Sequence, residues 1–286
     1  MAVLVDGRKL SSTILEEVAS KATELREKSS VVPTLAAVLV GEDGASVSYV
    51  RQKEKACERA GLRSVTVRLP ESVTEGELLA RIDGLNRDRS VHGIIVQLPL
   101  PRGMDVERVV SAVAPDKDVD GFHPLNLGLV MRGTPGLMPC TPAAVCVILD
   151  SLGIPLAGLR AVIVGRSLIV GRPLSCLLLQ RDLTVTVCHT RTRDLADEVS
   201  RADVVVAAAG RAGLVRGEWI KPGAVVIDVG TNPTPSGLIG DVEFAAAAER
   251  AGYITPVPGG VGPLTVAMLL KNVVSASTSC GMPRCP

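Results

Sequence analysis

The chain has 286 residues, of which 47% are apolar and 21% charged, and its formal net charge is +1. This length and apolar content predict one large or two medium globular domains with a sizeable core. The near-neutral charge and 2% aromatic content argue against a nucleic-acid-binding protein, and the short, interrupted apolar runs argue against a membrane-spanning one.

Cysteine and histidine usage sets further expectations. The seven cysteines include no C-x-x-C pair, and the three histidines are scattered, so we predict no metal site. The odd cysteine count and the absence of a signal-peptide pattern at the N-terminus favour a reduced, cytoplasmic chain.

The first hundred residues alternate between helical and extended patterns. Apolar residues at helical spacing predict helices over residues 6–28, 45–60 and 74–87. Apolar runs predict buried strands over residues 34–40 and 91–97 and an alternating strand over 63–69. Thr74 and Glu77 have the spacing of a capping box at the start of the third helix. Strand–helix alternation of this kind is typical of an α/β layer.

Residues 115–142 break this pattern. The segment 115–126, with sequence PDKDVDGFHPLN, is polar and predicts a loop, and residues 137–142 predict a second irregular stretch. A helix is expected over 143–152, which leads into the next α/β segment.

A glycine turn lies near the middle of the sequence. The buried strand expected over 160–164 is broken by Gly165, and Gly171 with Pro173 opens a leucine-rich helix. A helix N-terminus that faces a glycine turn can hold a phosphate group. The spacing departs from G-x-G-x-x-G, because Ser167 replaces the middle glycine and the last glycine comes one position late. A plain strand–turn–helix without a ligand is the alternative.

The strand expected over 184–188 distinguishes between cofactors. An NAD-binding protein usually ends this strand with an acidic residue that binds the ribose hydroxyl. Here the strand is followed by Thr190 and Arg191, and Arg166 lies in the glycine turn. These groups suit a 2′-phosphate and favour NADP, although a solvated basic loop has the same composition.

The last third of the chain continues the α/β pattern. We expect strands over 203–208 and 224–229, a helix over 242–251, a rigid glycine-rich turn over 256–263, a closing helix over 265–274 and a mobile tail over 275–286.

Four polar residues of the first half form a candidate constellation. Tyr49 and Lys53 share a helix face at i, i+4 spacing, Gln97 ends a buried strand, and Asp120 lies in the polar loop. Each has an ordinary alternative: Lys53 as a solvated helix lysine, and Asp120, like Asp116 and Asp118, as a turn former.

Taken together, these segments resemble one family. The motifs ASVSYVRQKEKA, GIIVQLPLP, KDVDGFHP, PCTP, VGRSLIVGRPLS and PVPGGVGPLT, in this order, are similar to those of the bifunctional methylenetetrahydrofolate dehydrogenase/methenyltetrahydrofolate cyclohydrolases. The resemblance covers residues 5–272. It implies oxidation of 5,10-methylenetetrahydrofolate with NADP and hydrolysis of the methenyl product to 10-formyltetrahydrofolate.

The resemblance also implies roles for particular residues. Tyr49 would stack on the folate, Lys53 would be the catalytic group tuned by Gln97, and Asp120 would bind the pterin. The further expected substrate-binding residues are Leu98, Pro258, Gly259 and Gly260. The expected cofactor-binding residues are Gly165, Arg166, Ser167, Thr190, Arg191 and Thr231. Relatives often carry serine where this chain has Thr190, which keeps the hydroxyl.

The predicted fold is α/β with two domains. Residues 1–142, completed by a C-terminal helix over 264–286, would form the folate-binding catalytic domain, and residues 143–263 a Rossmann-like NADP-binding domain with a parallel sheet. The family implies a homodimer that serves one-carbon metabolism and purine biosynthesis, with no nucleic-acid or membrane partner. Two alternatives remain open from sequence: a shikimate-dehydrogenase-like enzyme with a Lys/Asp pair, and a non-catalytic NADP sensor.

Overall fold

The computed structural model describes residues 1–134, 136–235 and 237–279, which divide into two compact units. The six-strand unit comprises Met1–Ser11, Val130–Thr134 and Thr141–Thr265. The three-strand unit comprises Ser12–Leu129 and the described residues of 136–140 and 266–279.

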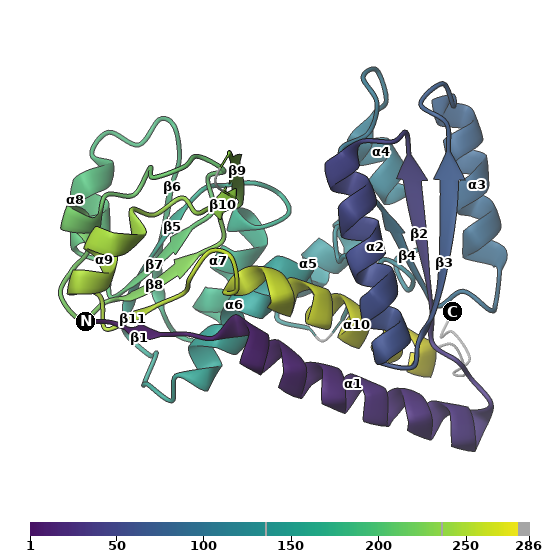
Figure 1. The fold of residues 1–286 in the computed structure, drawn as a ribbon, viewed down its shortest axis with the longest axis horizontal. Helices are drawn as coiled ribbons and strands as arrows, with labels where there is room; N and C mark the ends of the chain where they lie inside the picture. Colours follow the sequence, from purple (N-terminus) through teal and green to yellow (C-terminus); the bar gives the residue numbers. More distant parts are fainter. Residues whose placement is uncertain (135, 236, 280–286) are drawn as a thin grey trace. The chain divides into compact units, whose positions relative to one another are not determined.

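The three-strand unit is built on a fully parallel sheet of order β3-β2-β4 (Figure 1). Its strands are β2 (Thr34–Val40), β3 (Arg63–Leu69) and β4 (Gly93–Val96). The central strand β2 is buried at every position, as expected for an apolar run with neighbours on both sides. The chain runs from β2 to β3 on one side and returns to β4 on the other. This reversal creates a topological switch point at the carboxyl ends of β2 and β4, where α/β proteins bind ligands.

Helices of the three-strand unit begin where the sequence indicates. They are α1 (Gly7–Ser29), whose first turn belongs to the six-strand unit, α2 (Gly44–Arg59) and α3 (Glu75–Arg87). The predicted capping box is present: Thr74 Oγ1 accepts from the Glu77 backbone N–H at 3.3 Å, and the Thr74 N–H donates to Glu77 Oε2 at 2.8 Å. α2 packs on β2 and β3.

Residues 97–151 are more helical than their sequence indicates. α4 (Val106–Ser111) was not predicted, and α5 (Pro124–Arg132) begins inside the segment expected to be a loop. α6 (Cys140–Ser151) begins three residues before the expected start, so the predicted irregular stretch ends at Pro139. Proline is tolerated in a first helical turn, where its missing N–H would be unpaired in any case, and this explains why Pro124 and Pro142 lie inside helices.

The six-strand unit carries a parallel sheet of order β1-β11-β8-β7-β5-β6. The strands are β1 (Val3–Leu4), β5 (Arg160–Val164), β6 (Thr184–Cys188), β7 (Val204–Ala207), β8 (Val225–Asp228) and β11 (Tyr253–Ile254). The Rossmann-like parallel sheet predicted from the sequence is therefore confirmed. Its switch point lies at the carboxyl ends of β5 and β7.

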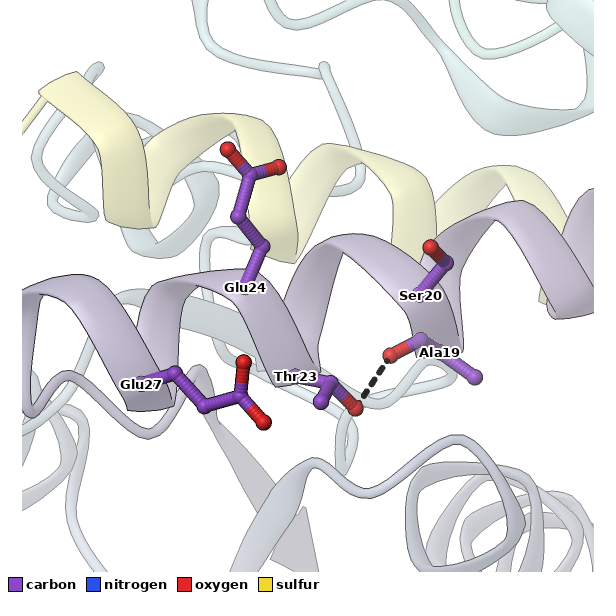
Figure 2. A pocket seen from close by; sticks show the side chains of 5 residues that line it. All are labelled: Ala19, Ser20, Thr23, Glu24 and Glu27. Atoms are coloured by element: carbon purple, nitrogen blue, oxygen red, sulfur yellow. Dashed lines mark hydrogen bonds between the residues drawn. The ribbon is translucent and has the colours of Figure 1, made fainter.

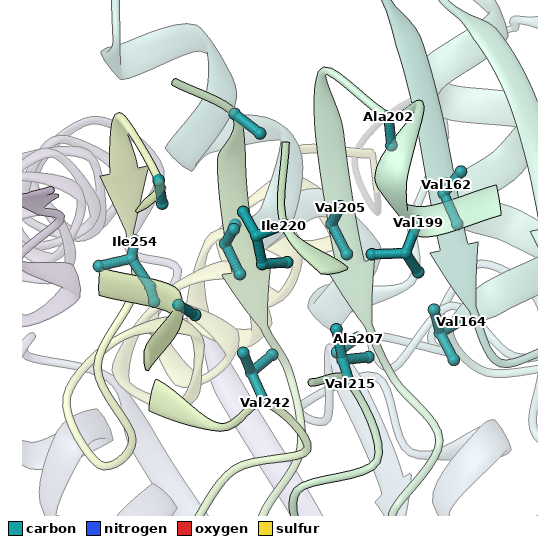
Figure 3. Packing of buried hydrophobic residues seen from close by; sticks show 14 of the residues in the cluster. Val162, Val164, Val199, Ala202, Val205, Ala207, Val215, Ile220, Val242 and Ile254 are labelled. Carbon is teal, nitrogen blue, oxygen red and sulfur yellow. The ribbon is translucent and has the colours of Figure 1, made fainter. Parts of the chain in front are cut away.

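A buried apolar cluster fills one face of this sheet (Figure 3). Alternate strand residues such as Val162, Val205 and Val226 meet Val199 from α8 (Leu195–Ser200) and Ala247 from α9 (Phe244–Arg250). Small β-branched side chains let the helices approach the strands closely and hold the sheet as a rigid platform. α7 (Gly171–Leu179) packs on β5 and β6.

The C-terminal helix begins earlier than predicted. α10 (Val261–Ser279) begins inside the glycine-rich segment and includes residues 275–279, which the element pattern assigns to a mobile tail and the domain prediction to the C-terminal helix. Small residues such as Ala276 and Ser277 are buried in it, which explains why a segment without large apolar side chains is helical. The rest of the expected tail lies outside the described residues.

The two units differ in detail from the predicted domains. Met1–Ser11 belong to the six-strand unit because β1 pairs in parallel with β11. Val130–Thr134 also cluster there, where the Gln180 side chain binds the carbonyl of Val130. Within the described residues, no helix combines the length and the apolar character needed to cross a membrane.

Candidate active site

Lys53 and Gln97 meet at the switch point of the three-strand sheet. The Asp43 carboxylate caps α2 by accepting the Ser46 N–H at 2.8 Å, and this fixes the start of the helix that carries Lys53. Lys53 Nζ donates to Gln97 Oε1 at 3.1 Å, and Gln97 Nε2 donates to the Leu98 carbonyl at 2.8 Å. The second bond orients the amide so that its oxygen faces the amine. Lys53 therefore has a neutral acceptor and is not a freely solvated helix lysine.

Tyr49 lies one turn before Lys53 on the same helix. The residue is 43% exposed, so its ring is accessible to a ligand. Lys53 and Gln97 are half-buried. An open aromatic ring beside a half-buried amine is a suitable arrangement for a flat, polar heterocycle.

Asp120 lies on a loop that buried polar side chains hold in place. Asp118, only 3% exposed, accepts the His123 N–H at 2.7 Å and Asn126 Nδ2 at 2.8 Å. On the other side, Asn272 Nδ2 of α10 donates to the carbonyls of Val119 and Met138, both at 2.8 Å. The segment that the sequence marks as an irregular loop is thus rigid at Asp120.

The electrostatics of this loop connect it to Lys53. Burial raises the pKa of Asp120 above its ordinary value, the charge of Lys53 opposes this, and Asp118 adds to it. Burial, with the Asp120 charge, also raises the pKa of the buried Cys140 thiol. Lys53, Gln97 and Asp120 therefore form one electrostatic group.

Asp118, Asn126 and Asn272 were missed as functional supports by the sequence reasoning. Asn272 had a detectable signal, because it is an amide within the apolar final helix. Its partners are backbone carbonyls more than a hundred residues away in sequence, which no local pattern reveals.

The glycine turn after β5 is shaped by close backbone contacts. Gly165 has φ of +130°, and a Cβ there would lie 2.1 Å from the Ala208 carbonyl oxygen. A Cβ on Gly171 would lie 2.1 Å from the Gly165 carbonyl oxygen, so the start of α7 is held against the turn. Ser167 Oγ accepts the Val170 N–H at 3.1 Å. The turn thus has the tight shape that backbone approach to a phosphate requires, despite its unusual spacing.

The loop after β6 presents basic and hydroxyl groups. The His189 N–H donates to Thr192 Oγ1 at 2.9 Å, and the Arg191 N–H donates to His189 Nδ1 at 3.1 Å, so the turn is ordered by its own side chains. Thr190, Arg191 and Arg166 are exposed. Arg181, Arg201 and Arg216 of this unit are ion-paired. In the described residues neither Arg166 nor Arg191 is ion-paired, and residues 189–193, which directly follow β6, include no acid that would prefer a ribose hydroxyl; the acid after them, Asp194, caps α8.

The remaining expected residues also lie in the six-strand unit. Thr231 is exposed and follows β8. Pro258 and Gly259 follow β11, and a Cβ on Gly7 would lie 1.7 Å from the Gly260 carbonyl oxygen, so this turn abuts the start of α1. The structure groups Tyr49, Lys53, Gln97, Leu98 and Asp120 in the three-strand unit. It groups Gly165, Arg166, Ser167, Thr190, Arg191, Thr231, Pro258, Gly259 and Gly260 in the six-strand unit.

A surface hollow along α1 lies apart from these residues (Figure 2). It is lined by Ala19, Ser20, Thr23, Glu24 and Glu27. Thr23 Oγ1 donates to the Ala19 carbonyl, and Glu24 pairs with Lys21 and Lys28, so these two polar side chains of the hollow are already engaged. No predicted site residue lines it. Among the described residues, no three metal-binding side chains cluster anywhere.

Comparison with known proteins agrees with this arrangement. The model of the tetrahydrofolate dehydrogenase/cyclohydrolase catalytic domain matches residues 5–120, and that of the NAD(P)-binding domain of the same family matches residues 139–280. The chain belongs to the tetrahydrofolate dehydrogenase/cyclohydrolase family. This membership decides against the shikimate-dehydrogenase-like alternative.

Individual members of the family match this chain over nearly their whole length. The bifunctional protein FolD of Bordetella bronchiseptica is 56% identical over 277 residues, which cover 96% of this chain and 98% of the relative. The crystal structure of the bifunctional methylenetetrahydrofolate dehydrogenase/cyclohydrolase FolD of Campylobacter jejuni superimposes with a TM-score of 0.95 at 46% identity, covering 98% of this chain and 99% of that one. The corresponding Trypanosoma brucei enzyme, complexed with NADP and an inhibitor, gives 0.93 at 44% identity and 97% coverage of both chains.

Proposed function

We propose that this protein oxidises 5,10-methylenetetrahydrofolate to the 5,10-methenyl form with NADP and then hydrolyses that cation to 10-formyltetrahydrofolate. The observation that carries the proposal is the Lys53–Gln97 hydrogen bond at the switch point of the three-strand sheet. It supplies an amine, held by a neutral group, where an α/β sheet binds its ligand.

The oxidation requires placement of the substrate. NADP, when bound, supplies the acceptor for the hydride that leaves the methylene carbon. We assign folate stacking to the open ring of Tyr49 and pterin recognition to the Asp120 carboxylate, with Leu98, Pro258, Gly259 and Gly260 as further substrate contacts. The rigid Asp120 loop supports this assignment, because hydride transfer is steeply sensitive to the alignment of the reacting carbon.

The hydrolysis requires movement of protons. Water adds to the methenyl carbon and loses a proton. The bond from this carbon to the ring nitrogen N5 then breaks, N5 takes up a proton, and the added hydroxyl gives up its proton to become the formyl C=O, so that one proton is released overall. We assign this shuttle to the Lys53 amine. Gln97 suits the role, since its amide oxygen accepts a hydrogen bond from either charge state of the amine, whereas a carboxylate would favour the ammonium form.

The cofactor preference is assigned to the loops after β5 and β6. Arg166 and Arg191 are exposed and have no ion pair among the described residues, and with Thr190 they suit the 2′-phosphate of NADP. No acid ends β6 or directly follows it to select NAD. Ser167 in the glycine turn and Thr231 after β8 complete the proposed cofactor contacts. The NADP complex of the Trypanosoma brucei relative supports this choice.

Two further properties belong to the proposal. The five cysteines of the described residues are free, which supports a reducing, cytoplasmic setting for one-carbon supply to purine biosynthesis. In the described chain, β3 pairs with β2 alone and leaves an edge of seven residues, which supports assembly as a homodimer. Sedimentation analysis of the purified protein tests this assembly.

A single assay tests the two activities. Methylenetetrahydrofolate and NADP are added to the purified protein, and NADPH and the methenyl chromophore are followed together. We expect NADPH to accumulate while methenyltetrahydrofolate stays low, because hydrolysis follows oxidation. Binding of NADP without turnover would instead favour the alternative of a non-catalytic NADP sensor.

A further inference from the structure

Two aspartates outside the predicted site lie at the carboxyl edge of the six-strand sheet. Asp228 ends β8 and is 4% exposed, and Asp241 follows the hairpin of β9 (Asn232–Thr234) and β10 (Gly237–Ile239) and is fully buried. Among the described residues, neither carboxylate is ion-paired with a lysine, arginine or histidine. Burial of a carboxylate without a cationic partner costs free energy unless hydrogen bonds compensate for the lost water. The hydrogen-bond partners of the two aspartates should therefore account for their burial.

Asp228 is held by backbone N–H groups. Its Oδ1 accepts from Gly230 and from Asp241, both at 2.9 Å, and its Oδ2 accepts from Val242 at 2.9 Å. Its own N–H donates to Thr255 Oγ1 at 2.8 Å. Each carboxylate oxygen faces a donor, so an amide in this position would turn an NH₂ group toward a backbone N–H.

Asp241 extends the network to two more loops. Its Oδ2 accepts the N–H groups of Ala209 at 2.6 Å and Gly210 at 2.8 Å, directly after β7. Its Oδ1 accepts Asn232 Nδ2 at 2.9 Å, after β8. The two carboxylates therefore join the ends of β7 and β8 to the segment that follows β10.

This network brackets residues assigned to the cofactor. Thr231 lies between Gly230, which is bound by Asp228, and Asn232, which is bound by Asp241. The β7 loop abuts the phosphate turn, since a Cβ on Gly165 would lie 2.1 Å from the Ala208 carbonyl oxygen. Gly230 and Asp241 are closely packed, because a Cβ on Gly230 would lie 2.3 Å from Asp241 Oδ1.

We propose that Asp228 and Asp241 are positioning residues for the dinucleotide, which hold the Thr231 loop and the loop behind Gly165 in place without touching the cofactor. The inference rests on the proposed function, which assigns this edge of the sheet to NADP. Its specific content is that loss of either carboxylate weakens NADP binding and leaves the chemistry at Lys53 intact.

The test compares Asp241→Asn and Asp228→Asn with a matched control, Asp203→Asn. Asp203 lies just before β7, at the opposite edge of the same sheet, where it binds Lys221. For each protein, calorimetry gives the Kd of NADP, and steady-state kinetics give KM for NADP, kcat and the rate of hydrolysis of added methenyltetrahydrofolate. Hydrolysis involves no hydride transfer and so reports on the three-strand unit. Fluorescence of Trp219, the one tryptophan of the chain, verifies folding of the six-strand unit.

We expect Kd and KM for NADP to rise by about tenfold to a hundredfold in both variants, because the new NH₂ group faces another donor: a backbone N–H in Asp228→Asn, and the Asn232 amide or the N–H groups after β7 in Asp241→Asn. Hydrolysis and the control should match the wild type. The double variant Asp241→Asn with Asn232→Asp exchanges donor and acceptor, and should recover part of the NADP affinity. Should Asp241→Asn fail to fold, Asn232→Ala at a half-buried residue removes one bond to Asp241 and one to the Ile239 carbonyl while both carboxylates stay, and a smaller rise in Kd is expected.

Unchanged Kd and KM for NADP in the folded variants would overturn the inference. So would a parallel loss of hydrolysis and oxidation at unchanged Kd, which would mark the carboxylates as general stabilisers. Failure of the proposed function would show differently, as absence of both activities in the wild-type protein, while the calorimetric comparison would still decide the role of the carboxylates in NADP binding.

Discussion

The Lys53–Gln97 pair shows how a single contact changes the chemistry of a surface helix. A lysine on an amphipathic helix is ordinarily solvated and serves solubility. Here Lys53 is half-buried, and its amine donates a hydrogen bond to the amide oxygen of Gln97 at 3.1 Å. The amide is neutral, so this partner adds no charge. The proposed role of Lys53 in hydrolysis rests on this contact.

Replacement of Lys53 separates the two proposed reactions. Lys53→Met keeps most of the side-chain volume and removes the amine, so hydrolysis of methenyltetrahydrofolate should fall by about two to four decades. Oxidation should fall less, because Tyr49 and Asp120 still place the substrate and no proton need move to Lys53 during hydride transfer. Separate assays of the two steps on the folded variant check this, and methenyltetrahydrofolate should accumulate while NADPH still forms.

Lys55→Met is the matched control. Lys55 lies two positions further along α2 and is exposed, so the same substitution there should leave both rates unchanged. Hydrolysis close to the wild-type rate in Lys53→Met would exclude Lys53 as the proton shuttle.

Asp228 gives the six-strand unit a pH-dependent stability. Burial raises its pKa from the ordinary 3.8 to about 6, against the backbone N–H groups that lower it. Because the folded-state pKa is the higher one, the contribution of Asp228 to the free energy of unfolding is greatest below about pH 4 and is lost as the pH rises through about 6. The difference in this free energy between the wild type and Asp228→Asn should shift by up to about 3 kcal/mol, in favour of the wild type, on going from pH 7 to pH 4.

Denaturant titrations followed by Trp219 fluorescence at several pH values measure this difference. Other titrating groups are common to both proteins and cancel in it. A difference that stays constant with pH would show that Asp228 keeps an ordinary carboxyl pKa in the folded protein.

At the scale of elements, the position of Asp120 is decided by how three segments pack. β4 begins at Gly93, where a Cβ would lie 2.6 Å from Val119 Cγ1 and 3.1 Å from Val273 Cγ2 of α10. The loop and the helix can therefore approach the strand only because residue 93 has no side chain. Asn272, adjacent to Val273, binds the carbonyl of Val119 from the same helix.

A pair of glycine substitutions tests this packing. Gly93→Ala should lower the free energy of unfolding by about 1–3 kcal/mol, because the methyl group overpacks a filled site, and should raise KM for methylenetetrahydrofolate as Val119 and Asp120 shift. Gly84→Ala, in α3 with open space around it, should instead stabilise the protein by about 0.5–1 kcal/mol and leave KM unchanged. Denaturation midpoints and folate kinetics of both variants are the measurements. Equal stability of the two variants would mean that Gly93 is not tightly packed.

The contrast between predicted and unpredicted elements has a physical basis. Strands such as Thr34–Val40 and Arg160–Val164 were predicted at their observed bounds, because their apolar runs are uninterrupted and end at glycine or polar residues. α5 was missed, since Pro124 suggests a break. The last turns of α10 were predicted both as tail and as helix, since residues 275–279 are small and polar. These segments are helical through tertiary packing, which local propensity does not encode.

The candidate site divides in the same way. Lys53 and Gln97 were predicted as site residues, and their hydrogen bond follows from strand order, which brings the end of β4 beside the helix that follows β2. Asp228 and Asp241 were not predicted. Their partners are backbone N–H groups of loops that the sheet brings together, and such partners leave no mark in residue identity.

For the whole molecule, the division into two units implies that the two reactions depend on different parts of the chain. The proposed hydrolytic group, Lys53, lies in the three-strand unit. The proposed cofactor-binding residues lie in the six-strand unit. The net charge of +1 provides no general attraction for a multiply charged nucleotide. We therefore attribute the proposed preference for NADP over NAD to particular arginines.

Removal of these arginines should change the cofactor preference and nothing else. In Arg191→Ala or Arg166→Ala, KM for NADP should rise by about one to two decades, because a charge-assisted bond to the 2′-phosphate contributes about 1.5–3 kcal/mol. KM for NAD, which has no such phosphate, and hydrolysis of methenyltetrahydrofolate should stay at wild-type values. Arg160→Ala is the matched control, since Arg160 is exposed at the start of β5, the opposite end of the strand that leads into Gly165. Equal losses with NADP and NAD would place these arginines at a part of the dinucleotide that both cofactors share, and the preference for NADP would then need another origin.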